Sequence, residues 1–509
     1  MTLPDWLDPL YSADEMRAAD EWAIEQAGVP SIDLMERAGE GLARAAAAVA
    51  AGREGRIRVV VGKGNNGGDG LVGARVLRAD GHEVDVLAVG PLEDLRADAR
   101  ENLERLVGEP PRPFEPEALA GSACVLDCVL GTGFSGTPRE PAASAIAAMN
   151  HSGAPLVACD VPSGVDASSG EIQGEAVGAL MTATFHGSKL GLHVAPGAFR
   201  SGEVRVIEIG IPRGAPGARS AGLIAERVLG LVPARRRDSS KFTSGVVVIA
   251  GGARGLTGAP CMAAMSAARA GAGYVQVAVP ASVEPAIELR LLEQMTLGLE
   301  EGERGAHSPA GAERVAELAE RAGSVVLGPG IGRTDGAFEF ARRVSRSVAA
   351  PLLVDADGLN AHAGRLTSLA DRDDPTVLTP HAGELARLLE TESTAIEAHR
   401  LQAVRRAAAE SGAVVVLKGD DTLVAAPDGP VAVSPGGTPA LATAGTGDVL
   451  SGLVGALLAK GLDAFAAASA GVLAHARAGQ VAAALVGADH TIASDVIDAL
   501  PDALGRAGT

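Results

Sequence analysis

The chain has 509 residues, more than one hydrophobic core usually organises, so we expect two domains of roughly 200–300 residues each. Hydrophobic residues make up 47% of the chain, which is enough to fill both cores. The formal net charge of −19 excludes nucleic acid and anionic membrane surfaces as main partners, because either would repel such a chain. Any phosphate-bearing ligand must therefore be held by local loops.

The cysteines and the apolar segments favour a cytoplasmic protein. All four cysteines lie in apolar stretches, which is typical of buried reduced thiols and not of disulfides or a metal site. The first fifteen residues lack the basic and apolar regions of a signal peptide. Residues 464–486 are strongly apolar, but a histidine, an arginine and a glutamine interrupt them. We therefore expect a buried helix there and no membrane span.

The N-terminal part alternates strands with helices. Ser12 and Glu15 have the spacing of a capping box, which predicts a helix running to about Gly28. A strand at 57–61 leads into the glycine-rich loop 62–70 and a further helix, although this loop matches neither a GxGxxG nor a P-loop pattern. Further strands are predicted at 84–89, 124–129, 156–159 and 204–209. This alternation predicts a mostly parallel sheet in a Rossmann-like three-layer sandwich.

Polar residues follow the predicted strands at their carboxyl ends, where such sheets bind ligands. Asn65, Asn66 and Asp69 follow the first strand, Asp127 lies at the third, and Asp160 and Ser163 follow the fourth. Oxygen donors without Cys or His companions suit a hard cation, and Asn and Ser beside one carboxylate suit potassium. The alternative is that these side chains only form turns at the strand ends.

Four motifs between residues 57 and 197 resemble the epimerase domain of NAD(P)H-hydrate repair enzymes: NNGGDG after a VVVG strand, LDCVLGTGFSG, CDVPSGVDASSGE and TFHGSKLGLHVAPG. The resemblance implies that this domain interconverts the R and S hydrates at C6 of the reduced nicotinamide ring. It implies that the substrate contacts Asn65, Asn66, Gly67, Gly68, Asp69 and Asp160. It also implies that the substrate phosphates are wrapped by Gly131, Thr132, Gly133, Phe134, Ser135, Gly136 and Thr137. Potassium is expected at Asn66, Asp127 and Ser163.

The epimerisation requires reversible ring opening, or loss and return of water, assisted by acid–base groups. Asp160 is the first candidate for this catalytic role. Lys189 is the second, and a solvated lysine near a strand end is an equally good explanation of it.

The chain changes composition between the two predicted domains. We assign residues 1–214 to the first domain, residues 215–240 to an Arg-, Pro- and Gly-rich linker with a short helix at 225–231, and residues 241–509 to the second domain. The second domain again opens with a strand, at 245–250, followed by a glycine loop and an Ala-rich helix. Its loop sequence differs from the first, so we do not interpret the two as an internal repeat.

The segment GGTPALATAGTGDVLSG at 436–452 precedes a buried helix. The free backbone N–H groups of Gly445, Thr446 and Gly447 at the helix start can bind a phosphate. Asp448 would lie beside this anion, where a carboxylate is unfavourable unless it accepts a proton from a hydroxyl that attacks phosphorus. Taken alone, the segment is equally well explained as a glycine-rich turn.

Together with LGPGIG, DADGLN, TPHAGE and KGDDT, this segment resembles the ADP/ATP-dependent NAD(P)H-hydrate dehydratases of the ribokinase-like superfamily. The resemblance implies catalysis by Asp448 with magnesium and with ADP as the phosphoryl donor. It implies that the nucleotide is bound by Lys418, Gly419, Asp420, Asp421, Thr422, Gly445, Thr446 and Gly447. The hydrate pocket would contain Ala259, Gly330, His381 and Asp448. His381 could equally be a residue that only starts a helix.

One position departs from the family pattern, and one alternative function stays open. Thr438 replaces the asparagine that usually precedes the GTGD segment, which puts the nucleotide preference in doubt. The alternative is a ribokinase-like kinase of a vitamin-precursor alcohol with an N-terminal binding module. The expected partners are hydrated NADH and NADPH and the nucleotide, in a homo-oligomer, and the sequence leaves open which hydrate is preferred.

Overall fold

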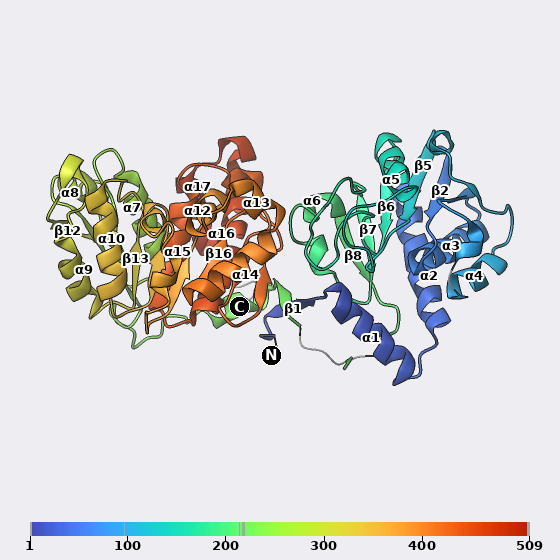
Figure 1. Ribbon diagram of the computed structural model, residues 1–509. Helices are drawn as coiled ribbons and strands as arrows, with labels where there is room; N and C mark the ends of the chain where they lie inside the picture. The colour runs from blue at the N-terminus through green and yellow to red at the C-terminus, as the bar shows by residue number, and fades with distance from the viewer. Residues whose placement is uncertain (1–2, 96, 213, 216–218, 506–509) are drawn as a thin grey trace. The chain divides into compact units, whose positions relative to one another are not determined.

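The computed structural model describes residues 3–95, 97–212, 214–215 and 219–505, and it divides into two compact units (Figure 1). The first unit comprises residues 9–221. The second comprises residues 4–8 together with the chain from residue 222 onward. The prediction of an α/β protein with two domains is therefore confirmed.

The first unit is built on a seven-stranded sheet in which every neighbouring pair of strands is parallel. The strand order is β4-β3-β2-β5-β6-β7-β8. The strands are β2 (Arg56–Val61), β3 (Val84–Ala88), β4 (Arg112–Pro113), β5 (Ser122–Cys128), β6 (Leu156–Cys159), β7 (Met181–Phe185) and β8 (Glu203–Ile207). The chain reverses its direction of travel across the sheet between β2 and β5. At such a switch point the loops diverge and leave a crevice at the carboxyl ends of the strands.

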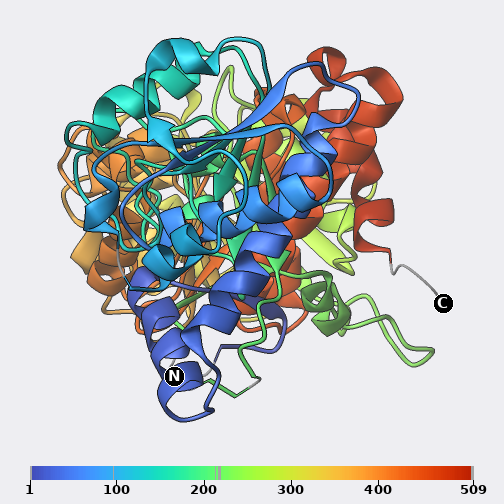
Figure 2. The same ribbon diagram turned by 90° about the vertical axis from the view of Figure 1, so that its right-hand side faces the viewer.

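Helices cover both faces of this sheet (Figure 1). Helices α2 and α3 pack against one another and, with α1 and α4, bury one apolar face of the strands (Figure 2). Helix α5 covers the opposite face through Ile146 and Met149. The helices are α1 (Ala13–Glu25), α2 (Ser31–Ala50), α3 (Asn65–Ala79), α4 (Ala97–Glu104), α5 (Ala142–His151) and α6 (Ala198–Ser201). The predicted three-layer sandwich is thus present.

The second unit contains an eleven-stranded sheet with the order β1-β9-β18-β17-β16-β15-β14-β13-β10-β11-β12. The pairs from β12 to β16 are parallel, whereas β16–β17 and β17–β18 are antiparallel. The strands are β1 (Leu7–Leu10), β9 (Ala221–Ile224), β10 (Val246–Ala250), β11 (Tyr274–Pro280), β12 (Met295–Leu299), β13 (Ser324–Leu327), β14 (Leu352–Val354), β15 (Thr376–Leu378), β16 (Val414–Leu417), β17 (Leu423–Ala425) and β18 (Val431–Val433).

The helices of the second unit pack on this sheet and on each other. Helix α15 contacts α7, α16 and the strands β10 and β13, while α14 contacts β16 and β17. The helices are α7 (Gly258–Arg269), α8 (Glu284–Glu288), α9 (Gly311–Ala319), α10 (Asp335–Ser347), α11 (Asp357–Asn360), α12 (Ala382–Leu388), α13 (Ser393–Ala398), α14 (Arg400–Ser411), α15 (Thr446–Ala459), α16 (Ala464–Val486) and α17 (Ala493–Leu504). The buried helix expected at 464–486 is α16. Among the described residues, none of the helices is both long and apolar enough to cross a membrane.

The stretch predicted as a linker contributes structure to the second unit. Residues 216–218 of this stretch lie outside the described residues. Strand β9 lies between β1 and β18, and the short helix expected at 225–231 is the 3-10 helix η4 (Glu226–Leu231). The Ala225 N–H donates to the Trp6 carbonyl over 3.1 Å. Residues 222–231 are therefore held in the second unit and are not a free linker.

Two local predictions can be compared with the backbone directly. The capping box of Ser12 and Glu15 is present, and the helix it opens ends at Glu25, three residues before the predicted end at Gly28. All four cysteines are buried and unpaired, as predicted.

Candidate functional site

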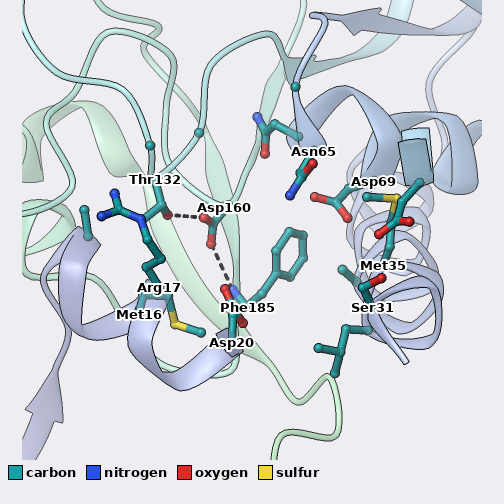
Figure 3. A pocket seen from close by; sticks show the side chains of 18 of the residues that line it. Met16, Arg17, Asp20, Ser31, Met35, Asn65, Asp69, Thr132, Asp160 and Phe185 are labelled. Atoms are coloured by element: carbon teal, nitrogen blue, oxygen red, sulfur yellow. Dashed lines mark hydrogen bonds between the residues drawn. The ribbon is translucent and has the colours of Figure 1, made fainter. Parts of the chain in front are cut away.

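A cavity of about 1030 Å³ opens at the carboxyl ends of the strands in the first unit (Figure 3). It lies at the switch point between β2 and β5. Its walls come from α1, from the start of α2 and α3, from the loop after β5, and from Asp160, Phe185 and Lys189. The volume is within the range of pockets that hold nucleotide-sized ligands.

The Asp160 carboxylate is the most heavily bonded group of this cavity. Its Oδ1 accepts hydrogen bonds from Lys189 Nζ (2.5 Å), from the Thr184 hydroxyl (3.2 Å) and from the Phe185 N–H (3.2 Å). Its Oδ2 accepts a hydrogen bond from the Thr132 hydroxyl. Asp160 has a φ of 65°, a left-handed conformation that is strained for a residue other than glycine and that recurs at functional sites.

These bonds fix the charge state of Asp160. Burial alone would raise the pKa of Asp160, but the charge and hydrogen bonds of Lys189 and Thr132 lower it below the usual value. Lys189 is 1% exposed, and its Nζ also donates to the Phe185 carbonyl over 2.7 Å. The two residues predicted as catalytic are thus brought together as a buried ion pair in which Asp160 stays ionised.

Besides Asp160, five carboxyl groups line the same cavity: those of Asp20, Glu21, Asp69, Asp94 and Asp98. Asp69 projects from α3 and is 8% exposed, and Asp20 projects from α1. Among the described residues, neither carboxyl has a hydrogen-bond or ion-pair partner. Burial, followed by the charges of Asp160 and Asp20, raises the pKa of Asp69 well above its usual value. Burial also raises the pKa of Asp20 to about 6, against the opposing charge of Lys189.

Asp20 was missed by the sequence interpretation. The available signal was the spacing of Ala13, Met16, Arg17, Asp20 and Ile24, which places them on one face of α1. All five line the cavity. The sequence does not tell whether this face of α1 covers a ligand site or the core. Asp20 could therefore not be identified as a site residue from the sequence.

The predicted substrate loops contribute unequally to the cavity. The lining includes Asn65, Asn66, Asp69, Gly131, Thr132, Gly133 and Phe134. It does not include Gly67, Gly68, Ser135, Gly136 and Thr137. A Cβ at Gly67 would lie 2.0 Å from the Gly62 carbonyl oxygen, and one at Gly68 would lie 2.6 Å from the Met35 sulfur. These two glycines therefore allow α3 to pack closely, which positions its first turn.

The three residues predicted to hold potassium converge on the loop after β5. The Ser163 hydroxyl donates to Asp127 Oδ1 (2.6 Å) and accepts from the Leu130 N–H (2.8 Å), while Asn66 Nδ2 donates to the Leu130 carbonyl (3.0 Å). All three side chains are buried. The donors are a carboxylate, an amide, a hydroxyl and a backbone carbonyl, which is an oxygen set that suits a hard, weakly charged cation. The residues therefore fit potassium.

In the second unit, Lys418 connects the segments that were predicted to form the nucleotide and hydrate sites. Its Nζ donates to Asp355 Oδ1 over 2.9 Å and lies 3.8 Å from Glu384 Oε2. A Cβ at Gly447 would lie 3.5 Å from the same Nζ. Burial works to lower the pKa of Lys418, but Asp355 and Glu384 outweigh it and raise that pKa, so the amine stays cationic.

Asp448 follows Gly447 in the first turn of α15. Burial, and then the charge of Asp355, raise the pKa of Asp448 to about 7, while Lys418 opposes the rise. A carboxyl group that titrates near neutral pH is suited to accept a proton from a substrate. Asp355 itself is 2% exposed and accepts a second bond from the Ser451 hydroxyl over 2.7 Å.

The backbone before Asp448 depends on a glycine. Gly445 precedes α15 with a φ of 94°, and a Cβ there would lie 2.5 Å from the Met262 sulfur. The hydroxyl of Thr446 donates to the carbonyls of Leu441 and Thr443, each over 2.8 Å. The Thr446 N–H also donates to the Thr443 carbonyl over 3.4 Å, so the GTGD segment is a fixed turn that opens the helix.

The KGDDT loop joins β16 to β17. The Gly419 N–H donates to the Thr422 hydroxyl over 3.2 Å, and this hydroxyl donates back to the Gly419 carbonyl over 2.6 Å. Asp420 is exposed, whereas Asp421 is 4% exposed and pairs with Arg400 through two contacts of 2.9 Å. The Asp421 carboxylate therefore faces the protein interior, in contrast to the predicted contact with nucleotide.

The remaining predicted residues occupy neighbouring loops. A Cβ at Gly330 would lie 3.2 Å from the Ala259 Cβ, so these two predicted pocket residues are adjacent. His381 caps α12, and its Nδ1 accepts from the Gly383 N–H over 3.0 Å. Its ring is also 3.5 Å from Glu384. The capping explanation of His381 is therefore confirmed, and the ring shares its neighbour Glu384 with Lys418.

Two further residues complete the description of this region. His475 on α16 has a hydrogen bond to the Thr446 backbone, and burial lowers its pKa to about 4. The sequence interpretation missed it, because a histidine inside an apolar helix has no motif around it. Thr438, the position that departs from the family pattern, caps the 3-10 helix η7 (Pro439–Leu441) by accepting from the Ala440 N–H over 3.4 Å.

Comparisons with known proteins match both units. A family model described as "NAD(P)H-hydrate dehydratase" matches residues 246–502, and one described as "YjeF-related protein N-terminus" matches residues 31–191. The bifunctional NAD(P)H-hydrate repair enzyme Nnr of Salinibacter ruber is 40% identical over 447 residues, which cover 83% of this chain and 82% of the relative. The protein of the same name from Moorella thermoacetica is 39% identical over 439 residues, with the same two coverages.

Among solved structures, the ADP/ATP-dependent NAD(P)H-hydrate dehydratase of Bacillus subtilis, co-crystallised with ATP/Mg²⁺, is similar to this chain. It is 28% identical with a TM-score of 0.47, and the match covers 55% of this chain and 95% of that one. The family resemblance inferred from the motifs is confirmed, and the chain belongs to the family of bifunctional NAD(P)H-hydrate repair enzymes.

Proposed function

We propose that the protein repairs hydrated NADH and NADPH in two steps. The first unit interconverts the R and S hydrates at C6, and the second unit dehydrates the S hydrate at the expense of a nucleotide. The observation that carries the dehydratase assignment is the position of Asp448, a carboxyl with a pKa of about 7, beside Lys418 and in the first turn of α15. The match to both family models supports the pairing of the two activities.

Dehydration needs a better leaving group than hydroxide. Asp448 accepts the proton of the C6 hydroxyl, and the hydroxyl oxygen attacks the terminal phosphoryl group of the nucleotide. The N–H groups of Gly445, Thr446 and Gly447 stabilise the charge on that phosphoryl group, and Lys418 adds a positive charge. The ring nitrogen lone pair then expels phosphate from C6. Loss of a C5 proton restores the dihydronicotinamide ring.

The carboxylates around Lys418 in the second unit favour binding of the nucleotide as its magnesium complex. Asp355, Glu384 and Asp448 surround one lysine, so the site carries an excess of negative charge. Within the described part of the chain, no group of three or more His, Cys, Asp or Glu side chains could hold a metal ion alone. Mg²⁺ commonly binds through substrate phosphates with few protein ligands, so the residues fit this mode of binding. When bound, magnesium would supply charge neutralisation at the phosphates.

We propose that the exposed residues of the KGDDT loop contact the nucleotide. Lys418, Gly419, Asp420 and Thr422 would contact the nucleotide, whose donor form we propose to be ADP, giving AMP and phosphate. For Asp421 we propose a supporting role, because its carboxylate is bonded to Arg400. Ala259, Gly330 and His381 would line the hydrate pocket.

In the first unit, we propose that the cavity binds the hydrated dinucleotide. Asn65, Asn66, Asp69 and the loop 131–134 would contact it, since all of them line the cavity. Potassium would be held by Asn66, Asp127 and Ser163, and it would fix the loop after β5 that contacts the substrate. Residues 1–214 would form the epimerase domain and residues 241–509 the main part of the dehydratase domain. A homo-oligomer and a cytoplasmic location are proposed from the sequence, and the four unpaired cysteines suit a reducing compartment.

The test uses separated R and S hydrates of NADH, each incubated with ADP or ATP. Recovery of the absorbance of the reduced ring together with phosphate release is expected for the S hydrate. A phosphorylated product that accumulates without ring recovery would instead support the kinase alternative and refute dehydration. For the R hydrate, conversion faster than its spontaneous rate is expected, and conversion at the spontaneous rate would refute the epimerase assignment.

A further inference from the structure

The epimerase reaction needs two proton-transfer groups, because water leaves from one face of C6 and returns to the other. The leaving oxygen needs a proton donor, and the incoming water needs a proton acceptor. The ion pair of Asp160 and Lys189 is poorly suited to both tasks. The oxygens of Asp160 accept four hydrogen bonds, and Lys189 is buried between Asp160 and the Phe185 carbonyl.

Asp20 and Asp69 are two carboxyl groups of the cavity that are free for this chemistry and that interact with the charges of Asp160 and Lys189. Asp20 and Asp69 line the cavity, and among the described residues neither carboxyl is bonded to another side chain or to the backbone. They enter from different elements, Asp20 from α1 and Asp69 from α3. Figure 3 shows them on different sides of the space, with the Phe185 ring between them in this view and Asp160 on the side of Asp20. A ring held between them would present one face to each carboxyl.

We propose that Asp20 and Asp69 are the acid–base pair of the epimerase and that Asp160 is a positioning residue that holds Lys189. This inference rests on the proposed epimerase function of the first unit. In one direction, the C6–O bond breaks with both electrons on oxygen, which takes a proton from the Asp69 carboxyl and leaves as water. The nitrogen lone pair forms the C6=N bond. A second water adds to the opposite face, and its proton passes to the Asp20 carboxylate.

The reverse direction exchanges the two roles, so the pair serves both hydrates. The net result is the transfer of one proton from Asp69 to Asp20, and the reverse reaction returns it. This requires one carboxyl to be protonated while the other is ionised. The raised pKa values of both residues support such a state near neutral pH, because two nearby carboxyls without a cationic partner of their own do not both ionise readily. The other charged groups that face Asp20 are Glu21, Lys189 and Asp160.

Helix α1 also lies outside the segment that the family model matches, which begins at residue 31. The assignment of Asp20 therefore comes from the placement of α1 over the cavity.

The test compares Asp20→Asn, Asp69→Asn and Asp160→Asn in the full chain, with Glu25→Gln as a control on an exposed part of α1 that does not line the cavity. The R hydrate is the substrate, and the S product is followed through dehydration with ADP. Asp20→Asn and Asp69→Asn are each expected to lower the epimerisation rate by at least about 100-fold, the usual effect of removing an acid–base group. Dehydration of the S hydrate should stay unchanged in both, which verifies that the second unit is folded and active.

The pH profile separates an acid–base role from a structural one. The wild-type rate should fall at low pH, where Asp20 gains a proton, and at high pH, where Asp69 loses one. In the remaining activity of Asp20→Asn, the fall of the rate at low pH should be absent. In the remaining activity of Asp69→Asn, the fall of the rate at high pH should be absent. Rates within threefold of wild type in both variants would overturn the proposal. A wild-type chain that fails to convert the R hydrate at all would refute the epimerase function itself, which is a different outcome.

Discussion

The buried ion pair of Arg400 and Asp421 gives the most quantitative prediction. Arg400 on α14 is 7% exposed and Asp421 in the nucleotide loop is 4% exposed. Two contacts of 2.9 Å join them. Breaking a buried ion pair by removing one partner costs about 3–5 kcal/mol. We therefore expect Arg400→Met to destabilise the second unit by this amount.

In thermal unfolding, this loss corresponds to a decrease in Tm of about 6–10 °C, since a unit of this size loses roughly 2 °C per kcal/mol. The transition of the second unit can be identified because ADP should raise its Tm. The double variant Arg400→Met/Asp421→Leu removes both charges and should recover most of the lost stability. The KM of the double variant for ADP should nevertheless be higher than that of the wild type, because Arg400 also donates to the carbonyls of Leu417 and Lys418 at 3.4 Å each, and these contacts position the nucleotide loop.

The matched control is Arg406→Met on the same helix. Arg406 pairs with Glu410 over 2.7 Å, but the two side chains are 54% and 36% exposed. Exposed pairs of this kind contribute only about 0.3–0.5 kcal/mol, so little change in Tm is expected. If Arg400→Met lowered Tm no more than this control, or if the double variant were less stable than either single variant, the reasoning would be wrong.

Further predictions concern the phosphoryl-transfer site and the thiols. Since Asp448 acts as a base and its pKa is raised to about 7, kcat/KM for the S hydrate at saturating nucleotide should fall about tenfold per pH unit below pH 7. Asp448→Asn should remove this pH dependence and lower the rate by about 10²–10⁴-fold. If kcat/KM of the variant still fell below pH 7, the fall would belong to another titrating group. Gly445→Ala should lower the free energy of unfolding by about 1–2 kcal/mol, because Gly445 has a left-handed φ. It should also weaken ADP binding, because the added methyl group would collide with the Met262 sulfur and displace the turn. Unchanged ADP affinity would contradict this. The four cysteines should not react with a thiol reagent until the chain unfolds, because burial raises the pKa of each, and rapid labelling of native protein would refute this.

The fold could be predicted from the sequence because its signals are local. Apolar runs such as 57–61 and 246–250 are each followed by a glycine loop and a helix, so strand, loop and helix are all encoded within about thirty residues. The oxygen donors at the strand ends were predictable for the same reason. A parallel sheet brings its carboxyl ends to one edge, so Asn66, Asp127 and Ser163 had to meet there.

The parts that could not be predicted depend on contacts between distant segments. Asp421 belongs to a loop motif, but the residue that turns it inward is Arg400, which lies in a helix before the preceding strand. Asp20 likewise belongs to an ordinary amphipathic helix, and only the position of that helix over the cavity reveals its exposure to a ligand. No rule of sequence spacing predicts that Arg400 contacts Asp421 or that α1 lies over the cavity, because tertiary packing sets both contacts.

Strand β1 has a consequence for synthesis of the chain on the ribosome. Residues 4–8 belong to the second unit, yet their neighbour β9 follows about 210 residues later. At a translation rate of about 5–20 residues per second, these first residues wait roughly 10–40 s for β9 to be made. The complete first unit is synthesised during that interval. We expect the apolar side chains of Trp6 and Leu7, which are buried in the finished protein, to be available to chaperones in the nascent chain until the second unit forms.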